Sequence, residues 1–137
     1  MKKIVLAIIA VMVPLMLSAG STDFWFRHFS VEDGLSSSAV RAIMQDKYGF
    51  MWLGTDDGLN RYDGTTIKIY RLNPEGVNDY ISSLYDTTDR IWIGTGDGVY
   101  IYDYETESFE PFKLLTTKGD SIKTNVNHIA EDRDGNL

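Results

Sequence analysis

The sequence predicts an all-β fold, in which four-stranded antiparallel units repeat as the blades of a β-propeller. The first observation is an internal repeat, since "MWLGTDDGLNRYD" (residues 51–63) returns forty positions later as "IWIGTGDGVYIYD" (residues 91–103). The second is that short runs rich in Ile, Val, Trp and Tyr alternate with turn signals containing Gly and Asp. Repeats of about forty residues with four strands each are typical of propeller blades. We expect about two and a half blades.

The first segment, residues 1–20, has the composition of a secretory signal peptide. Two lysines precede an apolar run at 4–17, and small residues follow at 18–20. The alternative is an uncleaved membrane anchor, but the run is short for a bilayer span and Pro14 interrupts it. We therefore expect export to the periplasm, with membrane contact only through this segment.

Residues 21–39 are expected to form an N-terminal strand and a connection. "FWFRHF" (24–29) alternates well enough for a strand, and "SVEDGLSSS" (30–38) is rich in turn-forming residues. A helical turn near 37–41 is an alternative. Trp25 lies outside the repeat, so we expect it to cover a sheet edge or to contact a ligand.

Two complete blades are expected, at residues 40–79 and 80–125. The first blade should contain strands at 40–45, 50–54, 58–62 and 67–71. The second should contain strands at 80–85, 90–94, 98–102 and 109–113. Asp57-Gly58 and Asp97-Gly98 predict tight hairpins, because Gly adopts the positive φ that such turns require.

The residues shared by the two copies predict packing and turn roles. The Trp on the second strand should pack between neighbouring blades, and the Gly two positions later should let the blades approach closely. The shared structural residues are Trp52, Gly54, Thr55, Asp57 and Gly58 in the first copy, and Trp92, Gly94, Thr95, Asp97 and Gly98 in the second.

Residues 126–137, "VNHIAEDRDGNL", align without a gap on the first copy and predict the start of a third blade. The sequence stops one position before a third Trp would fall. We expect this chain to be a truncated or partial form of a longer protein.

The stretch "FSVEDGLSSSAVRAIMQDKYGFMWLGTDDGLNRYDG" (29–64) resembles the opening of the extracytoplasmic sensor region of hybrid two-component systems in Bacteroides-type bacteria. The repeats resemble the two-component regulator propeller repeat. The resemblance implies two periplasmic propellers, an immunoglobulin-like domain, a membrane helix, a histidine kinase, a receiver and a DNA-binding output domain. It also implies an oligosaccharide ligand, with kinase activity in parts outside this chain.

Composition excludes several other functions. A formal net charge of −7 without a basic patch argues against nucleic-acid binding, which depends on neutralising phosphates. The absence of cysteine excludes disulfides, thiol catalysis and zinc sites built on cysteine. Asp56, Asp57 and Asp97 lie in turns rather than as a converging acid pair, and "DRDGN" (132–136) lacks the spacing of an EF-hand. We therefore expect no catalytic residue, metal or cofactor.

The candidates for ligand contact are Asn60, Arg61 and Tyr62 in "GLNRYDG", with Trp25 as a fourth. Aromatic and Arg side chains suit sugar stacking and hydrogen bonding. The alternative for Tyr62 is packing between blades, because Tyr102 repeats it.

Three functional hypotheses follow. The first is a fragment of a ligand-sensing propeller of a hybrid two-component sensor kinase that responds to glycans. The second is a small exported binding module that self-assembles through unpaired sheet edges. The third is a propeller enzyme that acts on glycans, although no carboxylate pair suggests it.

Overall fold

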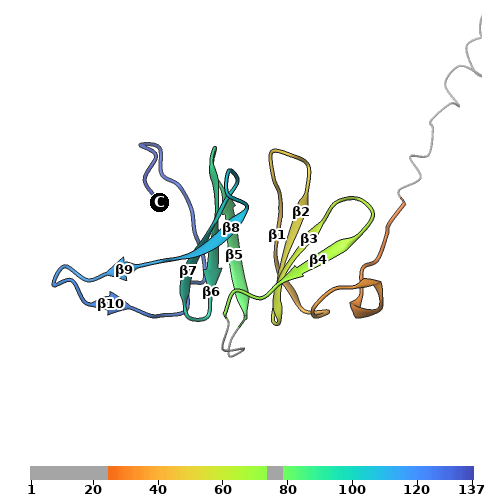
Figure 1. Ribbon diagram of the computed structural model, residues 1–137, viewed down its shortest axis with the longest axis horizontal. Coiled ribbons are helices and arrows are strands. Elements are labelled where there is room, and N and C mark those ends of the chain that lie inside the picture. The colour runs from red at the N-terminus through yellow and green to blue at the C-terminus, as the bar shows by residue number, and fades with distance from the viewer. Residues whose placement is uncertain (1–24, 74–78) are drawn as a thin grey trace, which may run out of the picture.

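The computed structural model describes residues 25–73 and 79–137. The segment expected to be a signal peptide lies outside the described residues. Two four-stranded antiparallel sheets stand side by side, and each has its strands in chain order (Figure 1). Apart from one short 3-10 turn, the regular elements of the described residues are strands. The predicted all-β fold of four-stranded units is confirmed.

The eight strands of the two sheets fall where the sequence predicts them, with every bound within one residue. The first sheet contains β1 (Val40–Gln45), β2 (Met51–Thr55), β3 (Gly58–Tyr62) and β4 (Ile67–Tyr70). The second contains β5 (Ile81–Asp86), β6 (Arg90–Thr95), β7 (Gly98–Asp103) and β8 (Ser108–Phe112).

The β2–β3 and β6–β7 hairpins are built alike, and their geometry explains three shared positions. The Thr55 hydroxyl donates to the Gly58 carbonyl at 2.9 Å and accepts from the Asp57 N–H at 3.1 Å. Thr95 makes the same two hydrogen bonds in its hairpin, at 3.0 and 3.1 Å. Gly58 has a φ of 114°, which side-chain-bearing residues rarely adopt. The recurring Thr and Asp-Gly are therefore turn residues.

The core lies between the two sheets and is centred on Trp52. This side chain is completely buried. Its ring lies 5.8 Å from that of Tyr70 in its own sheet, and 5.0 and 6.4 Å from those of Tyr102 and Phe109 in the other. Ile91 on β6 belongs to the same core and is also completely buried. Burial of this apolar surface holds the two sheets together.

Gly54 lies in close contact with the second sheet. A Cβ placed there would lie 2.6 Å from Cγ2 of Ile81, the first residue of β5. A Cβ at Gly94 would lie 2.4 Å from Oγ of Ser83 in its own sheet and 3.1 Å from Cγ1 of Val126 in the C-terminal segment. Val126 therefore occupies, beside the second sheet, the position that Ile81 occupies beside the first.

Residues 25–30 do not form the expected strand. They are irregular up to a 3-10 turn, η1 (Val31–Asp33), that a capping box begins. The Asp33 carboxylate accepts from the Ser30 N–H at 2.9 Å, and the Ser30 hydroxyl accepts from Glu32 N–H at 3.2 Å. An alternating pattern forms a strand only beside a partner edge, and this segment pairs with none among the described residues. The helical turn near 37–41 is also wrong, because β1 already begins at Val40.

A second difference is an arm that leaves the second sheet after β8. It carries the short strands β9 (Leu114–Leu115) and β10 (Ser121–Ile122), which pair with each other and extend away from the body (Figure 1). Strands of two residues have no periodicity from which they could be predicted.

Residues 126–137 form no strand, but they repeat the turn between β1 and β2. The Asp132 N–H donates to the Asn136 carbonyl at 2.8 Å, and the Gly135 N–H donates to the Asp132 carbonyl at 3.2 Å. Asp46 makes the same pair of turn contacts with Phe50 and Gly49, each at 3.0 Å. The resemblance between this segment and the first repeat thus extends to backbone geometry.

Candidate functional site

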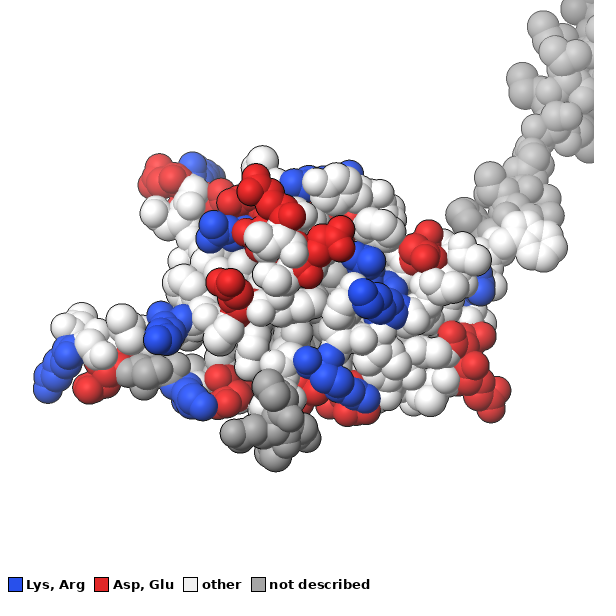
Figure 2. Space-filling view, in the orientation of Figure 1, with Lys and Arg blue, Asp and Glu red and all other residues white. Residues whose placement is uncertain are grey.

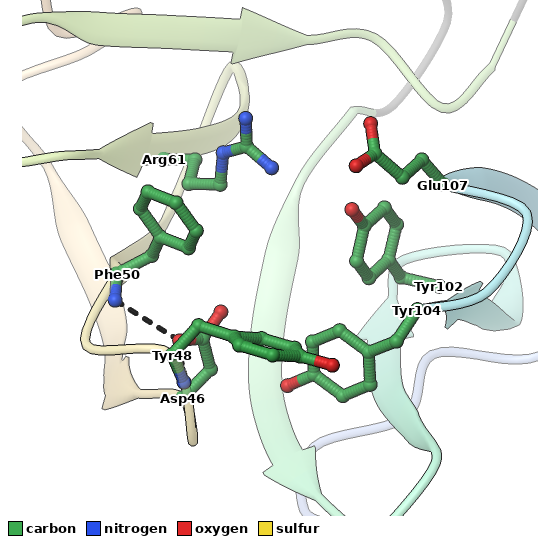
Figure 3. A pocket seen from close by; sticks show the side chains of 7 residues that line it. All are labelled: Asp46, Tyr48, Phe50, Arg61, Tyr102, Tyr104 and Glu107. Atoms are coloured by element: carbon green, nitrogen blue, oxygen red, sulfur yellow. Dashed lines mark hydrogen bonds between the residues drawn. The ribbon is translucent and has the colours of Figure 1, made fainter.

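A cleft of about 420 Å³ opens between the two sheets. One side is formed by the turn between β1 and β2 together with β3, and the other by the end of β7 and the turn that follows it. Its lining residues are Asp46, Tyr48, Phe50, Arg61, Tyr102, Tyr104 and Glu107 (Figure 3). Because each wall belongs to a different sheet, the cleft exists only when the sheets are packed together.

Asp46 builds the first wall, and both oxygens of its carboxylate accept hydrogen bonds. Oδ1 accepts from the N–H groups of Tyr48 and Phe50, at 2.9 and 3.0 Å. Oδ2 accepts from the indole N–H of Trp52 at 2.7 Å. The Asp46 side chain therefore fixes the turn that presents the Tyr48 and Phe50 rings, and it has a structural role.

Arg61 lies on β3 directly opposite Trp52 on β2. Its guanidinium carbon lies 4.6 Å from the ring centre of Phe50, 5.7 Å from that of Trp52 and 5.8 Å from that of Tyr70. These cation–π contacts hold the group in place. Within residues 25–73 and 79–137 it forms no ion pair or hydrogen bond, so its N–H donors remain available.

Tyr102 and Glu107 stand on the other side of the cleft. Tyr102 is only 3% exposed, and its hydroxyl points into the cleft (Figure 3). This hydroxyl has no hydrogen-bond partner in the described part of the chain, and burial raises its pKa. The Glu107 carboxylate faces the Arg61 guanidinium across the opening (Figure 3). Glu107 has a φ of 51°, which makes it the one non-glycine residue among those described with a positive φ.

Tyr104 completes the second wall as a rigid ring. Its hydroxyl donates to the Asp86 carboxylate at 2.8 Å, and its ring meets that of Tyr48 edge-on at 5.2 Å. Burial, together with the hydrogen bond to Asp86, raises the pKa of Tyr104 above its usual range. The phenol therefore stays neutral at physiological pH and offers the cleft an uncharged aromatic surface.

Asn60 does not face a ligand surface, which corrects the expectation from sequence. Its side chain is completely buried. Oδ1 accepts from the Ser36 N–H at 2.9 Å, and Nδ2 donates to the Ser36 hydroxyl at 2.8 Å. Because neighbouring residues of a strand point to opposite faces, Asn60 lies on the side away from Arg61. It anchors the N-terminal connection to β3.

Tyr62 also lies away from the cleft, and it does not pack between the two sheets as Tyr102 does. Its ring meets Phe29 at 4.8 Å, and its hydroxyl accepts from Arg27 Nη1 at 2.8 Å. Trp25 is 93% exposed. Of the four candidates, the structure therefore brings only Arg61 into the cleft. The other lining residues were missed because their proximity to Arg61 depends on how the two sheets pack together.

Other sites find no support in the residues described. There, no group of three His, Cys, Asp or Glu side chains is placed to hold a metal ion. No helix in that part of the chain has the length and hydropathy needed to cross a membrane. On the face in Figure 2, acidic and basic side chains are interspersed rather than gathered into one basic strip.

Comparison with known proteins identifies the repeat. The sequence profile of the two component regulator propeller matches residues 34–57. Residues 34–57 are therefore similar to a two-component regulator propeller repeat. The propeller repeat thus includes β1, β2 and the turn that forms the first wall of the cleft.

The chain is also similar to parts of two longer proteins. The chain is 56% identical over 59 residues to histidine kinase P4 of Formosa agariphila, a match that covers 43% of this chain and 4% of the kinase. It also matches the crystal structure of the extracellular domain of a putative hybrid two component system from B. thetaiotaomicron. That match has a TM-score of 0.67 and 32% sequence identity, and covers 80% of this chain and 16% of that domain.

These matches show that the chain resembles, in sequence and in fold, the propeller-type sensor region of a hybrid two-component system. The chain spans a small fraction of the length of either protein. The similarity to an extracellular domain indicates an exported protein.

Proposed function

We propose that this chain is part of a periplasmic sensor propeller that responds to a glycan and signals to a histidine kinase. The observation that carries the proposal is the match of 80% of the chain to the extracellular domain of a hybrid two component system. The cleft adds chemical support, because its aromatic rings and its available Arg61 guanidinium are groups that bind sugars. In this role the chain performs no catalysis of its own.

The test is genetic. The bacterium is grown on single purified polysaccharides, and the transcripts that each one induces are measured with and without the gene for this chain. We expect deletion to abolish induction by one polysaccharide and to leave the others unchanged. Unchanged induction on every polysaccharide would contradict glycan sensing.

A second candidate function is a small exported binding module assembled from several copies. The outer face of the second sheet favours it, because the ring of Trp92 lies there 5.0 Å from that of Phe112, beside a cavity of about 370 Å³. Trp92 is the repeat equivalent of Trp52, and Tyr62 is that of Tyr102. Pairing one copy's second sheet with the next copy's first sheet would reproduce the Trp52–Tyr102 contact.

Light scattering coupled to size-exclusion chromatography distinguishes the two candidate functions. Self-assembly predicts a discrete oligomer that the double variant Trp92→Ser with Phe112→Ser converts to monomer. Ile43→Ser removes another exposed apolar side chain and serves as the control. A monomeric parent chain would exclude the second function.

A further inference from the structure

Three polar groups of the cleft lack partners within the described residues and converge on one volume. They are the Arg61 guanidinium, the Tyr102 hydroxyl and the Glu107 carboxylate (Figure 3). The Tyr102 side chain is only 3% exposed, and its hydroxyl opens into the cleft without a hydrogen-bond partner among the described residues. A ligand in the cleft can therefore form hydrogen bonds with all three groups without breaking any that the described residues make.

We propose that this cleft binds one ring of a neutral sugar through adjacent hydroxyl groups, an inference that rests on the proposed glycan sensing. Each sugar hydroxyl can donate one hydrogen bond and accept others. A hydroxyl between the two sides of the cleft accepts from Arg61 and donates to Glu107. Its neighbour pairs with Tyr102. The first sugar hydroxyl thus meets a donor and an acceptor, and the second meets the Tyr102 hydroxyl, which can donate or accept.

The charges of the cleft select the ligand class. Arg61 contributes one positive charge, while Glu107 and Asp46 contribute two negative charges. An anionic sugar would be attracted to the Arg61 guanidinium. It would also face the Glu107 carboxylate across the opening, and like charges repel in a partly dehydrated site. A neutral sugar meets no such repulsion.

The shape and rigidity of the cleft also suit a sugar ring. Its volume of about 420 Å³ falls within the range of small-molecule sites, about 300–1,000 Å³. The rings of Phe50, Tyr102 and Tyr104 offer apolar surfaces for the C–H face of a sugar. Arg61 is held by aromatic contacts and Tyr104 by Asp86, so little conformational freedom remains to be lost on binding.

Glu107 gives a further reason to assign the cleft a function. Its left-handed backbone conformation disfavours a residue with a side chain, and Gly or Asn would be accommodated more easily. In the first sheet, the corresponding turn has a glycine, Gly64, at positive φ. A strained conformation that presents a carboxylate to a cleft is a feature found at binding sites.

The experiment is calorimetric titration of the full chain with two sets of oligosaccharides. The neutral set is built from glucose, galactose, mannose or xylose, and the charged set carries uronate or sulfate groups. We expect a neutral oligosaccharide to bind. Tyr102→Phe and Glu107→Gln should each weaken its binding about tenfold or more, the equivalent of one hydrogen bond to a ligand.

Two controls separate a loss of binding from a loss of folding. Tyr102→Phe removes only an oxygen that has no partner in the described residues, so its thermal midpoint should equal or exceed that of the parent chain. Arg41→Gln removes an exposed Arg41–Asp56 ion pair elsewhere on the first sheet and should bind like the parent.

The possible results separate this inference from glycan sensing itself. If a neutral oligosaccharide binds the parent, Tyr102→Phe and Glu107→Gln equally well, the cleft assignment is wrong while glycan binding stands. If only the charged set binds, the ligand class is wrong. If no oligosaccharide of either set binds, both the cleft assignment and glycan binding by this chain are contradicted.

Discussion

Two tryptophans that are equivalent in sequence have different surroundings. Trp52 is completely buried, donates its indole N–H to Asp46 and contacts rings from both sheets. Trp92 remains partly exposed, and its ring contact is with Phe112 of its own sheet. The difference arises because the second sheet packs against Trp52, whereas the irregular segment 126–137 lies beside Trp92.

This difference predicts unequal effects on stability. Trp52→Ala should lower the free energy of unfolding by about 3–5 kcal/mol, since it removes a buried aromatic side chain and leaves Asp46 without its indole donor. Trp92→Ala should lower it by less than half as much. Urea denaturation followed by circular dichroism measures both. Equal losses would contradict the assignment of Trp52 to the core between the sheets.

The sequence identified one residue of the cleft and missed the rest. Arg61 was named as a candidate because Arg and aromatic side chains suit sugar stacking and hydrogen bonding. Asn60 and Tyr62 were named for the same reason, but strand alternation turns both away from Arg61. Tyr104 and Glu107 could not be predicted as its neighbours, because their proximity depends on how the second sheet packs against the first.

At the level of elements, a close contact between the sheets depends on Gly54. Gly54→Ala would place a methyl group 2.6 Å from Ile81 Cγ2, so β2 and β5 would have to separate. We expect a loss of about 1–3 kcal/mol in the free energy of unfolding, as for other overpacked cores. The measurement is the urea midpoint.

Gly64→Ala is the matched control for Gly54→Ala. A Cβ at Gly64 meets no atom within 4 Å, but its φ of 98° is unfavourable for Ala. This variant therefore reports backbone strain without a steric clash. Cleft binding should be weakened by Gly54→Ala and kept by Gly64→Ala. The reverse order would show that the approach at Gly54 does not set the distance between the sheets.

The turns between β3 and β4 and between β7 and β8 make stability depend on pH. The backbone N–H of Thr106, with that of Glu105, holds the pKa of Asp103 below its ordinary 3.8, and Thr66 and Thr65 do the same for Asp63. A carboxyl whose pKa is lower in the folded state stabilises the protein above the unfolded pKa. This stabilisation is lost as the pH falls through the folded value.

We therefore expect the urea midpoint to decrease below about pH 4, the range set by the ordinary pKa of these carboxyls. The double variant Asp63→Asn with Asp103→Asn should show a smaller decrease, because an amide does not titrate. A decrease as steep as that of the parent chain would assign the acid sensitivity to other carboxyls.

At the level of the whole molecule, the two sheets share one core, whereas the arm and the C-terminal segment lie outside it. Hydrogen exchange should therefore show amides of β2, β5 and β6 opening together, with the free energy of global unfolding. Amides of β9 and β10 should exchange much faster, since a two-stranded hairpin alone is only marginally stable. Independent opening of the two sheets would contradict a shared core.

The fold was largely predictable because the repeat occurs twice in the sequence and its turns contain residues with specific backbone requirements. Asp57-Gly58 marked one hairpin, and Asp97-Gly98 marked the other. The arm and residues 25–30 could not be predicted in this way. Neither belongs to the repeat, and the structure of each depends on whether a neighbouring strand edge is available.

The surroundings of the three tryptophans also give the protein an optical signal. Trp25 is almost fully exposed, whereas Trp52 is completely buried in contact with both sheets. Indole fluorescence shifts to longer wavelengths when water reaches the ring. A chain in which Trp25 and Trp92 are replaced by Phe would emit from Trp52 alone. Its emission wavelength would then follow the separation of the two sheets directly, without an attached dye.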